Sequence, residues 1–215
     1  MLSASSSDEW PAITPSPADG PDPSSLELAY RERHRQLLQV LAAHIDEFGY
    51  DTTQINDIAR VANISKRTFY EHFGTKEMAL AELLRRAERA MYRGLVDAAV
   101  VGLPQGAEAT FHGMVAAWAG LLRGGPALSR LARKRASTLP MIAEQRDVFT
   151  ADCGRVFALA AQRLGSPLTP EEMGSVGLLV AWGVWGAMSN DILDREDIDS
   201  ELQSLARAIC RAFHV

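Results

Sequence analysis

Apolar residues recur every three or four positions along most of the chain, which is the spacing of amphipathic helices. Residues 26–48 are predicted to form the first helix, which ends at Gly49. Its apolar stripe consists of Leu37, Leu41, Ile45 and Phe48. No alternation of polar and apolar residues predicts a strand. The pattern therefore indicates an all-α fold.

Two short helices joined by a tight turn are predicted next. Thr53 is expected to cap the first of them, and Asn63 tolerates the left-handed backbone that a sharp turn needs. Ser65 is expected to cap the second helix, which carries Phe69 and Phe73 inward. Such a pair is a helix-turn-helix, in which the second helix lies in the major groove of DNA.

The rest of the chain keeps the helical spacing. Thr75 is expected to cap a long fourth helix, and Gly124-Gly125-Pro126 breaks the chain farther on. The fourth helix has a stripe of Leu80, Leu83, Leu84, Ala87, Met91, Leu95 and Ala98. The helix before the break is marked by Phe111, Met114, Val115, Trp118 and Leu122. A short helix is predicted after the break, followed by one over residues 142–164.

The last two predicted helices have more apolar surface than burial on one side requires. One face of helix 170–189 carries Leu178, Trp182 and Trp185, and another carries Val176, Val180, Gly183 and Ala187. A helix that is apolar on two sides must be buried on two sides. The last helix has its own stripe of Ile198, Leu202, Leu205, Ile209 and Phe213. These helices either complete the core or form a subunit interface.

Composition indicates the size of the core, the order of the N-terminal segment and the location of the protein. The chain has 215 residues, of which 47% are hydrophobic, and this is ample for a packed core. Residues 1–24 are rich in Ser, Pro and Asp, so we expect a disordered tail. Neither a membrane span nor a signal peptide is predicted, and we expect a cytoplasmic location. Cys153 and Cys210 are then expected to be reduced thiols.

The net charge of −5 is an argument against DNA binding, because DNA-binding domains are commonly basic. Locally the sign reverses, since only Glu71 opposes the basic side chains of residues 60–76. These basic side chains are Arg60, Lys66, Arg67 and Lys76. We therefore expect any DNA binding to depend on a local patch and on helix N-termini that face phosphates.

Residues 30–90 resemble the DNA-binding domain of the tetracycline-repressor-like (TetR) family of transcriptional regulators. The resemblance rests on Ile58-Ala59, Ala62-Asn63-Ile64-Ser65, Thr68-Phe69-Tyr70, His72-Phe73 and Lys76-Glu77. Asn63 stands where relatives usually have Gly, and Arg67 where many have a small residue. The resemblance implies a tail over residues 1–24, a helix-turn-helix domain over 25–76, and an effector-binding and dimerisation domain over 77–215.

The second helix of the motif carries the candidate DNA contacts. Lys66 and Arg67 can donate to guanine O6 and N7, and Thr68 can meet a thymine methyl group or a phosphate. Phosphate contacts are predicted for Thr53, Tyr70, His72 and Lys76, and the resemblance places contacts at the equivalent tyrosine, histidine and lysine. Alternatively, Tyr70 is partly in the core and Lys76 is a solvated side chain beside Thr75.

The resemblance also implies an effector pocket and a dimer interface in the second domain. The predicted pocket residues are Met114, Trp118, Phe149, Phe157, Trp182 and Trp185, whose scarcity of charge favours a small apolar effector. Ordinary core packing would explain the same residues. The predicted interface residues are Val176, Val180, Gly183, Ala187, Leu202, Leu205 and Ile209. A helix-turn-helix protein normally binds two half-sites as a dimer, which favours this interface.

The predicted function is a homodimeric transcriptional repressor that leaves its operator DNA when an effector binds. An activator of the same fold is one alternative, and a helical ligand-binding protein with a structural helix-turn-helix is another. No enzyme motif, catalytic residue or cofactor is predicted. Glu108 and His112 could share a metal ion, but no third ligand is evident nearby, and no metal site is predicted.

Overall fold

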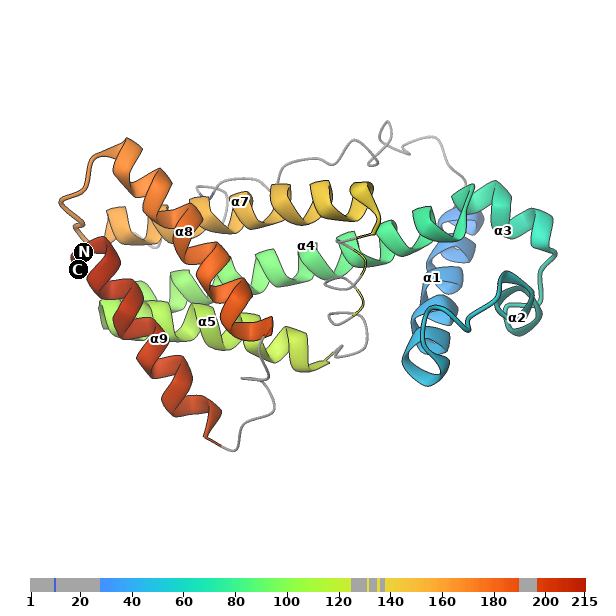
Figure 1. Ribbon diagram of the computed structural model, residues 1–215, viewed down its shortest axis with the longest axis horizontal. Coiled ribbons are helices and arrows are strands. Elements are labelled where there is room, and N and C mark those ends of the chain that lie inside the picture. Colours follow the sequence, from blue (N-terminus) through green and yellow to red (C-terminus); the bar gives the residue numbers. More distant parts are fainter. Residues whose placement is uncertain (1–9, 11–27, 125–130, 132–134, 136–137, 190–196) are drawn as a thin grey trace. The chain divides into compact units, whose positions relative to one another are not determined.

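A computed structural model of the chain describes residues 10, 28–124, 131, 135, 138–189 and 197–215. Within these residues the structure contains helices and no strand (Figure 1), which confirms the all-α prediction. The first four helices are α1 (Leu28–Phe48), α2 (Ile55–Val61), α3 (Lys66–Phe73) and α4 (Lys76–Gly102). A 3-10 turn, η2 (Leu103–Gln105), precedes α5 (Ala107–Gly124), α7 (Pro140–Arg163), α8 (Pro170–Ser189) and α9 (Ile198–Phe213).

The chain forms two compact units, and α4 contributes to both. The first unit comprises Pro15–Ala87 and Pro126–Gln145. The second comprises Met1–Thr14, Glu88–Gly125 and Arg146–Val215. The short helix predicted after Gly124-Gly125-Pro126 falls mostly outside the described residues.

The first unit is organised around the inward faces of α1, α2, α3 and the start of α4. Its core includes Leu37, Leu41, Ile58, Phe69, Phe73 and Leu80, all at most 4% exposed. α2 packs against both α1 and α3. Apart from Phe48, the apolar stripes predicted for α1 and α3 are therefore buried as expected, and the burial fixes the direction in which α3 presents its other face.

The turn between α2 and α3 has the predicted backbone. Asn63 adopts a left-handed conformation with φ of 51°, and the amide of Ile64 donates to the carbonyl of Ala59 at 2.9 Å. Ser65 caps α3, because its hydroxyl accepts the amide of Thr68 at 3.0 Å. The cap predicted at Thr75 is also present, with the amide of Met78 as donor at 3.1 Å.

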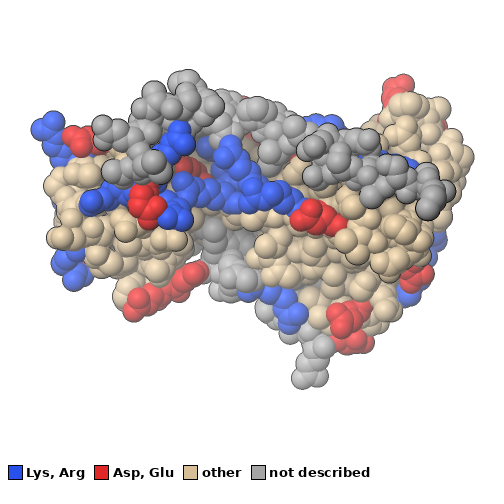
Figure 2. All heavy atoms as spheres, turned by 180° about the vertical axis from the view of Figure 1, so that it is seen from behind, with Lys and Arg blue, Asp and Glu red and all other residues tan. Residues whose placement is uncertain are grey.

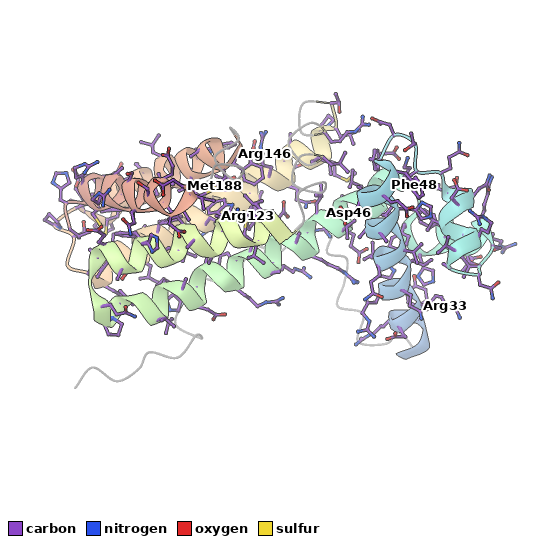
Figure 3. All side chains as sticks on the ribbon, turned by 90° about the horizontal axis from the view of Figure 1, so that it is seen from below. Arg33, Asp46, Phe48, Arg123, Arg146 and Met188 are labelled. Carbon is purple, nitrogen blue, oxygen red and sulfur yellow. The ribbon has the colours of Figure 1, made fainter. Side chains whose placement is uncertain are left out.

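Two predictions for the first unit are wrong. The residue that caps α2 is Gln54, without a side-chain hydrogen bond, and the Thr53 hydroxyl instead donates to the Gly49 carbonyl at 2.7 Å. Phe48, labelled in Figure 3, was expected inside but is 53% exposed. It is the last residue of α1, so its ring contacts His44 on the same helix at a centroid distance of 5.2 Å.

The second unit buries one face of each of its helices. Its core includes Leu95, Phe111, Trp118, Phe157 and Phe213, and α5 and α9 lie side by side (Figure 1). α7 and α8 approach so closely at Gly154 and Gly177 that a Cβ added to Gly177 would lie 2.3 Å from the Gly154 carbonyl oxygen. Glycine at both positions therefore permits the two backbones to touch.

α8 is buried on one side only. Met173, Ala181, Val184 and Met188 are buried, whereas Leu179 is 72% exposed and Leu178 and Trp182 are partly exposed. The single chain therefore covers one side of this helix, and burial of the other side in a subunit interface stays a prediction. Within the predicted tail, Trp10 is 6% exposed and packs against the core of the second unit. Its ring lies 4.5 Å from the Arg163 guanidinium. The other tail residues are outside the described part of the chain.

None of the helices in the described ranges combines the length and the apolar character needed to cross a membrane.

Candidate DNA-binding surface

The buried residues of α3 determine which of its side chains face outward. Phe69 and Phe73 are one turn apart and buried, so Arg67 and Glu71 fall on the opposite side of the helix. Lys66 and Arg67 occupy the first turn, next to the Ser65 cap. The helix therefore presents two cations beside its own N-terminus, where backbone N–H groups favour an anion such as phosphate.

Arg67 forms an ion pair with Glu71 on this face and is the more exposed of the two side chains. Its Nε donates to Glu71 Oε1 at 2.8 Å, and the side chains are 88% and 55% exposed. The hydrogen bond and the charge of Glu71 raise the pKa of the Arg67 guanidinium above its ordinary value. Arg67 is thus held in one orientation while most of its surface remains available to a ligand.

Thr68 and Tyr70 flank this ion pair. The Thr68 hydroxyl lies 3.0 Å from the Ser65 hydroxyl, so it helps to close the first turn and is only half-buried. Tyr70 is 47% exposed and meets Phe69 edge to face at 6.0 Å. This agrees with the alternative that Tyr70 is partly in the core, and about half of its surface still faces outward.

His72 belongs to a polar cluster that joins three helices. Its Nδ1 lies 3.2 Å from the Nδ1 of His34 on α1, and the Nε2 of His34 lies 2.7 Å from Glu82 Oε1 on α4. The Tyr30 ring stacks on His72 with centroids 4.2 Å apart. Partial burial lowers the pKa of His72, and the charges of His34 and Arg33 lower it further, against the opposing charges of Glu71 and Glu82.

Glu82 is the acceptor of this cluster. Burial raises the pKa of Glu82, but the hydrogen bond from His34 and the nearby positive charges outweigh it, so the pKa is lowered overall. His34 Nε2 therefore donates to Glu82. In the contact between the two Nδ1 atoms, the tautomers decide whether His34 or His72 is the donor.

Lys76 is anchored within the unit and is not a freely solvated side chain. Its Nζ donates to the Tyr50 carbonyl at 2.6 Å and lies 4.2 Å from the centre of the Tyr50 ring. Desolvation lowers the pKa of Lys76. Thr53 is 2% exposed with its hydroxyl bonded to Gly49, so its side chain cannot reach a phosphate in this conformation.

Tyr50 contacts both Lys76 and Arg135, and this role was not predicted, because its only sequence signal is an aromatic residue after Gly49. The Arg135 guanidinium lies 5.0 Å from its ring and pairs with Asp51. Burial and the charge of Glu77 raise the pKa of Tyr50 to about 12. The loop between α1 and α2 is thus held by Lys76 and Arg135 together.

The chain has no general positive charge, since its net charge is −5. On the face shown in Figure 2, basic side chains gather in one stretch, whereas acidic side chains are scattered. A polyanion would therefore be bound through α3 and its surroundings and not through a general positive field.

The match to a known family covers the same part of the chain as this surface. Residues 37–83 match the family described as "Bacterial regulatory proteins, tetR family". Residues 37–83 are therefore similar to the N-terminal domain of that family. The resemblance seen in the sequence is confirmed. No curated protein matched the chain in sequence.

Solved structures of tetR-family regulators share the fold of the whole chain. A tetR-family transcriptional regulator from Mesorhizobium loti MAFF303099 has a TM-score of 0.65 and 21% identity, covering 87% of this chain and 97% of its own. One from Rhodococcus sp. has a TM-score of 0.64 and 20% identity, covering 85% and 99%. A transcriptional regulator from Saccharomonospora viridis, in complex with choline, has a TM-score of 0.59 and 20% identity, covering 84% and 96%. At these identities the likeness establishes the tetR-like fold.

Four of the predicted effector-pocket residues lie inside the core of the second unit. Met114, Trp118, Phe149 and Phe157 are at most 3% exposed. The Trp118 ring has Phe149, Phe157 and Trp185 around it at centroid distances of 6.1–6.4 Å. The indole N–H of Trp118 is buried without a hydrogen-bond partner. Trp182 differs, since it is 36% exposed with the Arg146 guanidinium 5.1 Å from its ring.

The predicted interface residues divide into two groups. Leu202 and Ile209 are buried in the chain's own core, so they are not free to contact a second copy. Val176, Val180, Ala187 and Leu205 are half-buried, and Gly183 is exposed. Leu179, which the sequence analysis did not single out, is the most exposed apolar side chain on α8.

Glu108, considered earlier as a metal ligand, lies 3.4 Å from the Arg207 guanidinium. The described residues contain no group of three side chains placed to hold a metal ion.

Proposed function

We propose that the chain is a homodimeric transcriptional regulator, acting as a repressor, that binds operator DNA through α3. The observation that carries the proposal is the exposed face of α3, where Lys66 and Arg67 stand beside a capped helix N-terminus. Such a helix in the major groove places long cationic side chains against base edges. Tyr70, His72 and Lys76 lie on or next to the same helix and are proposed as phosphate contacts.

Dimerisation is supported by the chemistry of α8. Leu178, Leu179, Trp182 and Gly183 give it an exposed face that is apolar or without a side chain. Contiguous apolar surface on a soluble protein commonly marks an interaction site. A second copy of the chain would cover this face and would supply the second α3 that a symmetric operator requires.

The proposed effector is a small, mainly apolar molecule with a hydrogen-bond acceptor. Trp118 supports this choice, because a buried N–H without a partner is costly and an acceptor on a ligand would satisfy it. The surrounding rings of Phe149, Phe157 and Trp185 would contact the apolar part. Choline, present in the Saccharomonospora viridis structure, is a useful comparison ligand because a quaternary ammonium also binds aromatic rings.

Selection of bound fragments from random double-stranded DNA tests the proposal. The parent protein is expected to enrich a motif with two related half-sites. Arg67→Ala is expected to lose about 1–3 kcal/mol of binding free energy at particular base pairs of that motif. If the folded, dimeric parent enriched no motif, a ligand-binding protein with a structural helix-turn-helix would be the better account.

Titration with and without operator tests the effector. A true effector must bind more weakly to the DNA-bound protein, by the same factor by which it weakens DNA binding. A ligand with equal affinity for the free and the DNA-bound protein would not be the effector.

Reporter expression with and without the protein separates a repressor from an activator.

A further inference from the structure

Glu71 is the only acidic residue of α3, and it lies on the exposed side of that helix. A carboxylate beside DNA is repelled by phosphates, so its place among the proposed DNA contacts calls for a physical reason. A pair of opposite charges four residues apart stabilises a helix modestly, and this alone would explain its presence. The geometry of the pair supports a more specific role.

Glu71 contacts the side of the Arg67 guanidinium and leaves its end free. The contact runs from Arg67 Nε to Glu71 Oε1 at 2.8 Å. A guanidinium has five N–H donors in a planar fork, and four of them belong to the two terminal Nη groups. One N–H from each Nη group can donate to guanine, so that O6 and N7 are bound together. Glu71 therefore orients the Arg67 fork without occupying it.

The second carboxylate oxygen of Glu71 has acceptor capacity to spare. An ionised carboxylate has about four acceptor positions, and the Arg67 contact uses one. Glu71 is 55% exposed, so a ligand can reach it. In the major groove the amino group that a carboxylate recognises is N4 of cytosine.

We propose that Glu71 determines specificity, by orienting Arg67 for guanine and by accepting a hydrogen bond from N4 of a cytosine in the adjacent base pair. This rests on the proposed function, since it requires α3 to lie in the major groove. Adjacent base pairs are about 3.4 Å apart along the duplex, so side chains already in contact reach neighbouring positions. The carboxylate also raises specificity by repulsion, because it weakens binding wherever it faces phosphate alone.

Two substitutions separate the two roles of Glu71. In Glu71→Gln the amide oxygen can still accept from Arg67 Nε, but the amide pairs with N6 and N7 of adenine. The preferred base at one position should therefore change from cytosine to adenine while the guanine preference persists. In Glu71→Ala both positions should lose preference, by about 5- to 150-fold in relative affinity.

The experiment is selection from a random duplex library with the full-length parent, both Glu71 variants, Arg67→Ala and a control. Glu32→Gln is the matched control, because Glu32 pairs with Arg35 on the exposed surface of α1 and lies outside the α3 surface. It should select the parent motif. Circular dichroism melting verifies that each variant is folded, as expected for a side chain that is half-exposed.

The possible outcomes distinguish this inference from the proposed function. A cytosine-to-adenine change in Glu71→Gln, together with relaxed preference at both positions in Glu71→Ala, supports it. If Arg67→Ala alters the motif while both Glu71 variants keep the parent motif and preferences, the inference is wrong and the proposed function stands. If the parent enriches no motif, both are wrong.

Discussion

α3 and α8 each expose one face, and the two faces differ in chemistry. The outer face of α3 carries Arg67 and Glu71, whereas that of α8 carries Leu178, Leu179 and Trp182. An oriented charged face suits a ligand with fixed charges and hydrogen-bonding groups, such as DNA. An apolar face suits a surface that excludes water, such as a second protein chain. The comparison indicates that side-chain chemistry, rather than exposure alone, separates the two proposed interfaces.

The largest expected effect is the loss of the dimer when a charge is placed on α8. Leu179→Glu would put a carboxylate into an apolar contact, and an unpaired buried charge costs about 3–5 kcal/mol. Sedimentation should show monomers at concentrations at which the parent is dimeric. Val101→Glu is the matched control, because Val101 is also an exposed apolar residue, 67% exposed, on another helix. A Leu179→Glu protein that stays dimeric would remove the proposed distinction between the two faces.

The buried side of α8 is tested by adding one methyl group. Gly177→Ala places a Cβ against the Gly154 carbonyl oxygen, and such overpacking commonly costs about 1–3 kcal/mol. Gly120→Ala, where a Cβ meets no atom within 4 Å, should instead stabilise its helix by about 0.5–1 kcal/mol. Denaturant unfolding measures both changes. Equal stability of the two variants would contradict the close crossing.

The support behind α3 is tested at Lys76. Lys76→Met keeps most of the apolar stem but removes the hydrogen bond to the Tyr50 carbonyl, with an expected loss of about 1 kcal/mol of unfolding free energy. DNA binding should weaken alike for all sequences, with a shallower salt dependence. Arg86→Met is a suitable control, since Arg86 makes only a 3.4 Å surface contact with Glu82. If both the stability and the salt dependence were unchanged, Lys76 would not belong to the proposed DNA-binding surface.

The smallest expected effects concern pH, and they have opposite signs for folding and for DNA binding. The pKa of His72 is lowered in the folded state, so the unfolded chain binds the proton more tightly and stability falls as the pH drops below the ordinary value of 6.5. Glu82 acts in the same direction, in a lower window below its ordinary value of 4.5. The free energy of unfolding of the parent, compared with His72→Gln, should show this loss.

DNA affinity should rise over the upper of these two windows. Protonation of His72 adds a positive charge and a second ring N–H, and both favour contact with a phosphate. The excess affinity at low pH should therefore be absent in His72→Gln. The groups that face His72 are Tyr30, Arg33 and His34 on α1, Glu71 on α3 and Glu82 on α4. A pH dependence that persists in His72→Gln would assign the effect to another of these groups.

Local sequence signals predicted the frame of the DNA-binding surface well. The Ser65 cap and the left-handed Asn63 are properties of a few adjacent residues, and both are present as expected. Thr53 failed as a cap because α2 begins one residue later than expected, with Gln54 at the N-cap position, and the Thr53 hydroxyl donates to the carbonyl of Gly49. Phe48 failed because a periodic stripe does not show where the neighbouring helices stop covering it.

Contacts between distant residues could not be read from the sequence. His72 meets His34 across 38 positions, and His34 meets Glu82 across 48, so the cluster exists only once three helices have packed. Lys76 has the same difficulty, because its partner Tyr50 lies 26 positions away. The apolar excess of α8 was visible in sequence, but pattern alone does not separate burial within a chain from burial against a second one.

The contact between Gly154 and Gly177 has a consequence for the inheritance of this protein. Every amino acid that replaces glycine adds at least a Cβ. At Gly177 that atom would lie 2.3 Å from the Gly154 carbonyl oxygen, and a change of side-chain rotamer cannot move a backbone oxygen. Variation at this crossing would be removed by selection even in descendants that bind a different operator or a different effector. Lineages that diverge in both should therefore keep this pair of glycines.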